Sequence, residues 1–130
     1  MTKKEATGDN NMPEFKGGAL AALKDTRKAS RRAVAEIQSR KKIAYNAQDY
    51  DEFEECASLL PVALNAEHLA TQRLIAGIIN ADELSILTLK QATIELDARI
   101  ERFKADAAKL SEIAEILSIV TSAVLLFKLV

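Results

Sequence analysis

The sequence has few of the residues that end helices or build sheets. Its 130 residues include four glycines, two prolines, no tryptophan and only 5% aromatic residues. Sheet proteins need turn residues and runs of aromatic or β-branched side chains, so this composition argues against a sheet fold. Apolar residues make up 48% of the chain, which excludes compositional disorder. The sequence therefore predicts a single all-α domain.

Cysteine is almost absent as well. Cys56 is the only one, which excludes an internal disulfide and fits a reducing compartment. Lys3 and Lys4 near the N-terminus are not followed by an apolar segment of the kind found in secretory signals. We therefore expect a cytoplasmic protein, with association to a membrane as the alternative.

Catalytic and metal-binding motifs are also missing from the sequence. There is no glycine-rich phosphate loop and no nucleophile elbow. His68 has no glutamate three residues before it, and on one straight helix it would lie roughly 18 Å from Cys56. One acidic cluster comprises Asp49, Asp51, Glu52, Glu54 and Glu55. It lacks the glycine and the ligand spacing of a calcium loop, and is better explained as negative charge at the start of a helix. We expect no enzyme activity, no metal and no cofactor.

What the sequence does contain is a long apolar seam in its C-terminal half. From Ile86 to Val124 an apolar or small residue recurs at alternating steps of three and four, the spacing of a helix packed along another helix. The seam comprises Ile86, Leu89, Thr93, Leu96, Ile100, Phe103, Ala107, Leu110, Ala114, Leu117, Thr121 and Val124. No glycine or proline interrupts it, so the pattern predicts one long helix over about residues 83–127.

Two further helices precede this one. A polar stretch over residues 1–14 reads as a flexible N-terminal tail, and residues 15–130 read as one helical domain. Helices are expected over about 18–46 and 50–79, where Asp49 has N-cap chemistry. Pro61 should kink or break the second helix, and Asn80 or Asp82 should cap the third. The result is an elongated three-helix hairpin, a coiled-coil-like bundle in which helices two and three are antiparallel neighbours.

The third helix would be longer than its partners. At 1.5 Å per residue it measures roughly 65–70 Å against roughly 45 Å for each of the others. Either the excess folds back, with Ser111 as a candidate cap, or it overhangs the bundle. The end of the chain is apolar around most of its circumference, so an overhang would have to be covered by another molecule.

A protein-interaction function follows from the overhang. We expect a non-enzymatic helical module that self-assembles or docks to a protein partner, as an adaptor would, through the apolar C-terminal helix. The expected interface residues are Ile113, Ile116, Leu117, Ile119, Val120, Val124, Leu126 and Phe127. A closed three-helix monomer is the alternative, if the first helix reaches far enough to cover them.

Two other functions use parts of the same sequence. The uncharged run from Ile116 to Phe127 is too short to span a bilayer, which needs about 20 residues, but it could lie in a membrane surface. Residues 1–46 carry 11 basic and 5 acidic side chains, and four of the basic ones share a helix face, which suggests nucleic-acid binding as a weaker alternative. That basic patch comprises Lys24, Lys28, Arg31 and Arg32.

Overall fold

Four helices and one very short strand pair make up the described part of the chain. The computed structural model describes residues 11–77 and 79–129. The all-α class is confirmed, but the three-helix hairpin with a long C-terminal helix is wrong, because the segment expected to be one helix over 83–127 is divided into two. The elements are α1 (Asn11–Asn46), α2 (Tyr50–Ala76), β1 (Ile79–Asn80), α3 (Glu83–Lys104), α4 (Leu110–Val124) and β2 (Lys128–Leu129).

Helix α1 begins at Asn11, about two turns before the expected start. Residues 1–10 of the expected tail lie outside the described residues, and its last four residues belong to α1. Helix α2 runs through Pro61 as one element, so of the kink or break expected there the break is wrong. Pro61 is exposed, so the carbonyl that loses its intrahelical bond can be hydrated.

Short polar side chains cap the N-terminal ends of α2 and α3, as the sequence predicts. The carboxylate of Asp49 accepts a hydrogen bond from the backbone N–H of Glu52 at 3.2 Å. Asp82 accepts one from the N–H of Ser85 at 2.7 Å. Gly77 caps the C-terminal end of α2, and its φ of 74° is left-handed and suits a residue without a Cβ.

The turn between α3 and α4 was not expected as a definite feature, because it contains neither glycine nor proline. Asp106 takes the left-handed conformation there, with a φ of 60°. Arg40 of α1 holds it in place, donating to the Asp106 carboxylate at 2.5 Å and to the carbonyl of Phe103 at 3.1 Å. Lys109, and not Ser111, occupies the N-cap position of α4.

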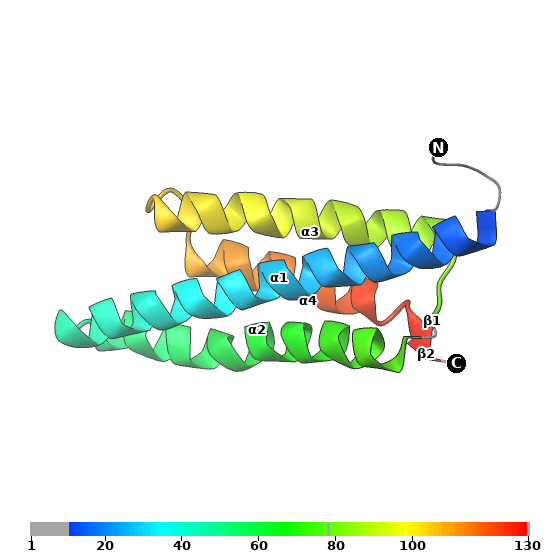
Figure 1. The fold of residues 1–130 in the computed structure, drawn as a ribbon. Coiled ribbons are helices and arrows are strands. Elements are labelled where there is room, and N and C mark those ends of the chain that lie inside the picture. Colours follow the sequence, from blue (N-terminus) through cyan, green and yellow to red (C-terminus); the bar gives the residue numbers. More distant parts are fainter. Residues whose placement is uncertain (1–10, 78, 130) are drawn as a thin grey trace.

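The helices form two antiparallel hairpins that pack face to face (Figure 1). Helix α1 lies along α2 and α3, and α4 lies along α2 and α3 from the other side. Helices α2 and α3 are therefore diagonal across the bundle and not neighbours, so their connection crosses from one hairpin to the other. Beside this crossing β1 and β2 form an antiparallel pair, with Ile79 opposite Leu129 and Asn80 opposite Lys128.

The two hairpins contribute side chains of different size to one continuous core. Helices α1 and α2 bury mainly alanines, which allow two helix backbones to approach closely. Larger side chains come from the second hairpin, where Leu89, Leu96, Ile100 and Phe103 of α3 meet the buried face of α4. The core also holds a buried pair of hydroxyls, Thr26 and Thr93, whose oxygens lie 2.7 Å apart.

Candidate interaction surfaces

Most of the expected C-terminal interface is inside the molecule. Six of its eight residues are buried by the chain's own helices, and only Ile119 and Leu126 are exposed, at 48% and 46%. The expectation that this segment lacks intramolecular cover is therefore wrong. Its physical reason is the turn at residues 105–109, which folds the end of the chain back between α2 and α3. The six buried residues are Ile113, Ile116, Leu117, Val120, Val124 and Phe127.

Arg73 of α2 fixes the end of this segment. Its side chain is only 7% exposed, and its Nε donates to the carbonyl of Phe127 at 2.7 Å. Burial lowers the pKa of the Arg73 guanidinium from its ordinary value. Its contact satisfies a carbonyl beyond the last turn of α4, where no intrahelical donor is available. A second attachment is the pairing of β2 with β1.

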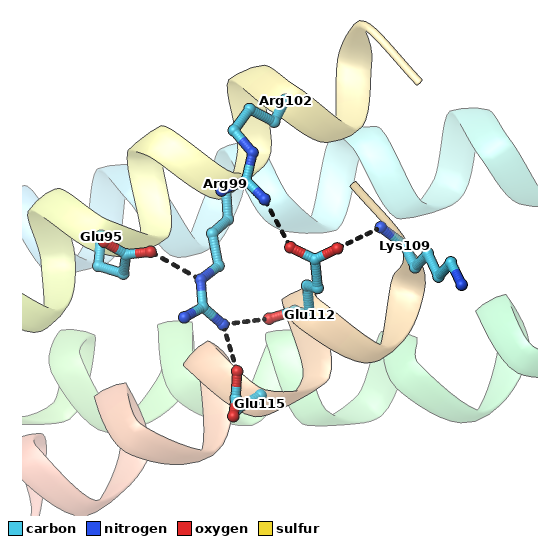
Figure 2. A network of polar contacts seen from close by, with 6 residues as sticks. All are labelled: Glu95, Arg99, Arg102, Lys109, Glu112 and Glu115. Atoms are coloured by element: carbon cyan, nitrogen blue, oxygen red, sulfur yellow. Dashed lines mark hydrogen bonds and ion pairs between the residues drawn. The ribbon is translucent and has the colours of Figure 1, made fainter. Parts of the chain in front are cut away.

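The start of α4 is held to α3 by a polar network (Figure 2). Arg99 donates to Glu95 at 2.8 Å, to the backbone carbonyl of Glu112 at 2.9 Å and to Glu115 at 2.6 Å. The hydrogen bonds that Arg99 donates to Glu95 and then to Glu115 raise the pKa of its guanidinium. Arg102 donates to the Glu112 carboxylate at 2.6 Å. These contacts fix the angle between the two helices of the second hairpin.

The expected basic patch is divided between two sides of α1. Arg31 pairs with Glu67 of α2 at 3.1 Å. Arg32 turns the other way, toward α3, where it pairs with Asp97 at 2.6 Å and with Glu101. Lys24 and Lys28 are exposed. Two of the four cations are thus already neutralised by carboxylates of the same chain, and these four side chains do not make one continuous cationic surface.

Cys56 and His68, the two residues considered as catalytic candidates, both lie on α2. Cys56 is buried, and burial, followed by the charge of Glu52, raises the pKa of its thiol, so the sulfur stays protonated. His68 is exposed on α2. Over residues 11–77 and 79–129 no three His, Cys, Asp or Glu side chains are grouped so as to hold a metal ion. No helix in these ranges has the length and apolar character needed to cross a membrane.

A second apolar stripe, which the sequence reasoning missed, runs along the outside of α3. Leu84, Leu87 and Ile94 are 71%, 49% and 69% exposed, and exposed Gln91 and Ala98 complete the series. The steps between these five residues are three, four, three and four, the spacing of a helix-packing seam. We call this set the α3 stripe.

The α3 stripe lies opposite the buried face of the same helix. Each of its residues precedes a member of the buried seam by two positions, for example Leu84 before Ile86 and Leu87 before Leu89. Two positions correspond to about 200° around an α-helix, so the two series occupy opposite faces. The signal that could have revealed the stripe is this doubled register, which gives α3 apolar residues on both faces.

Comparisons of the chain with protein-family models, with curated protein sequences and with solved structures find no match.

Proposed function

We propose that this chain is a non-enzymatic helical interaction module that binds another helix along the α3 stripe. The observation that carries the proposal is the exposure of Leu84, Leu87 and Ile94 at heptad spacing. Scattered apolar side chains are normal on protein surfaces, but three large ones in one helical register form a surface that a second helix can cover. The proposed surface is therefore on α3, in place of the C-terminal segment whose side chains fill the core.

The shape of α3 supports this proposal. The helix is 22 residues long and held on two sides, by α1 and by α4, so its outer face is presented on a rigid support. Contacts with Arg32 and Arg40 fix it to α1, and the network around Arg99 fixes it to α4. A preorganised surface loses little conformational entropy when it binds.

The other two functions draw less support from the described residues. The apolar side chains that a membrane would take up are mostly committed to the core. For nucleic acid, the ion pairs of Arg31 and Arg32 remove half of the proposed cationic face. Binding a helix along the α3 stripe requires neither the core side chains to become exposed nor these ion pairs to break.

A photo-crosslinking residue in place of Gln91 tests the proposal in living cells that express the chain. Gln91 lies at the centre of the α3 stripe, and its replacement removes no described hydrogen bond. We expect a discrete adduct, identified by mass spectrometry, that is lost when Ile94→Glu is added. The matched control places the same crosslinker at Ser118 of α4, which is also exposed. Equal adducts at both positions, or an adduct indifferent to Ile94→Glu, would contradict the proposal.

A further inference from the structure

A row of alternating charges runs along one flank of the α3 stripe. Glu83, Lys90, Asp97 and Lys104 follow one another at intervals of seven residues. Seven residues are close to two helical turns, so these side chains share one face at steps of about 10 Å. Lys90 and Asp97 line the groove between α3 and α1, which places the row on the side of the stripe nearest α1. Its signs read minus, plus, minus, plus.

This order has a particular symmetry. When the row is reversed end to end, each sign becomes its opposite. A second copy of α3, laid antiparallel against the first, would therefore set Glu83 opposite Lys104 and Lys90 opposite Asp97, each pair occurring twice about a twofold axis. All four contacts join unlike charges, which favours this alignment over shifted ones.

From this complementarity we infer that the partner of the α3 stripe is the α3 stripe of a second copy of this chain, packed antiparallel in a twofold dimer. The inference rests on the proposed helix-binding function and names its partner. In the register that the charges select, Leu87 lies against the small Ala98 of the other copy, and Ile94 lies beside its Gln91. Large side chains thus meet small or flexible ones across the seam.

A parallel arrangement would bring the charged row against the opposite flank of the stripe. In a parallel pair the charged row would face Thr88, Glu95 and Arg102 of the other copy. Thr88 carries no charge, Glu95 is bound by Arg99, and Arg102 is bound by Glu112. Within the row Asp97 likewise gives one oxygen to Arg32, and Lys104 makes only a loose contact with Glu101, at 3.8 Å. The parallel pair would leave Glu83 and Lys104 without an opposite charge, whereas the antiparallel pair gives one to all four residues of the row.

Charge-reversed variants test both the partner and its direction. One variant carries Glu83→Lys and Asp97→Lys, which makes the row wholly positive, and the other carries Lys90→Glu and Lys104→Glu, which makes it wholly negative. Sedimentation over about 5 to 500 µM measures each variant alone, the equimolar mixture and the unmodified chain. We expect the unmodified chain to dimerise reversibly, each variant alone to dimerise at least about tenfold more weakly, and the mixture to regain dimerisation.

The control reverses two charges elsewhere, with Glu54→Lys and Glu55→Lys on exposed positions of α2, and should leave dimerisation unchanged. Circular dichroism of every variant reports whether it is folded. The inference is overturned by a mixture that dimerises no better than its components, or by an unmodified chain that stays monomeric. If the chain is monomeric while the crosslinker at Gln91 captures another protein in an Ile94-dependent way, self-pairing fails and the helix-binding function stands.

Discussion

The carboxylate of Glu112 accepts hydrogen bonds from two directions at the turn between α3 and α4. One oxygen takes the backbone N–H of Lys109 at 3.3 Å, and the other takes Arg102 at 2.6 Å. The bond from Lys109 is the main cause of a pKa below the ordinary value of Glu112, and Arg102 adds to it. Because hydrogen bonds favour the charged form, the turn is stabilised while this carboxylate is ionised.

Replacing Glu112 with glutamine should therefore change the pH dependence of stability. A carboxyl whose pKa is lowered by folding stabilises the protein above its unfolded pKa, and that contribution disappears as pH falls through the folded pKa. We expect Glu112→Gln to be less stable than the unmodified chain at neutral pH. The difference in stability should shrink as the pH falls below 4.5, the ordinary pKa of a glutamate. Urea denaturation from about pH 7 to about pH 3 measures it.

The matched control is Glu54→Gln, which removes an exposed carboxylate of α2. A constant difference between Glu112→Gln and the unmodified chain at all pH values would show that its charge is not involved.

At these helix ends the sequence predicted the caps in which the capping residue itself supplies the capping group or conformation. Asp49, Asp82 and Gly77 act through their own side chains or their own backbone freedom, and such positions can be recognised one residue at a time. Lys109 could not be recognised in this way. Its cap is supplied by Glu112 from three residues downstream, and the left-handed residue before it is an aspartate in place of a glycine.

At the scale of elements, the division between α3 and α4 is the main feature that the apolar seam concealed. The steps Phe103, Ala107, Leu110 and Ala114 continue the alternation of four and three through the turn without a slip. Ala107 is exposed in that turn, so its place in the series is a coincidence of spacing. A periodic pattern reports which residues are apolar, and it cannot report that the backbone has reversed direction between them.

Helix α4 provides a direct comparison of a buried and an exposed position. Leu117 is fully buried, whereas Ile119, two residues on, is half exposed. We expect Leu117→Ala to lower the free energy of unfolding by about 2–5 kcal/mol, because it removes buried methyl groups and leaves a cavity. Ile119→Ala should cost less than about 1 kcal/mol. Chemical denaturation of both variants is the measurement, and equal losses would mean that α4 is not seated with this face inward.

At the scale of the whole molecule, the close packing of α1 and α2 depends on alanine. Ala63, Ala66 and Ala70 of α2 are completely buried, as is Ala29 of α1. A composition poor in glycine, proline and aromatic residues predicted helices, but it did not predict which helices approach closely. Which helices pack together depends on the diagonal placement of α2 and α3. The short connection between these two helices had suggested that they are neighbours.

A larger side chain at this interface should destabilise the bundle although it is more apolar. We expect Ala66→Leu to lower the free energy of unfolding by about 1–3 kcal/mol, because the closely packed core has no room for three more carbons. Ala35→Leu, on an exposed position of α1, is the matched control and should change stability by less than about 0.5 kcal/mol. A neutral or stabilising Ala66→Leu would indicate a gap between these helices.

The diagonal crossing between α2 and α3 also bears on how the molecule forms. Within each hairpin the two helices are joined by a short turn, so the contacts next to that turn are local in sequence and can form early. Contacts between the hairpins, such as Thr26 with Thr93 and Arg73 with Phe127, join residues 67 and 54 positions apart. They must wait until the two halves meet, and the short bridge from Gly77 to Asp82 keeps those halves close together while they search for one another.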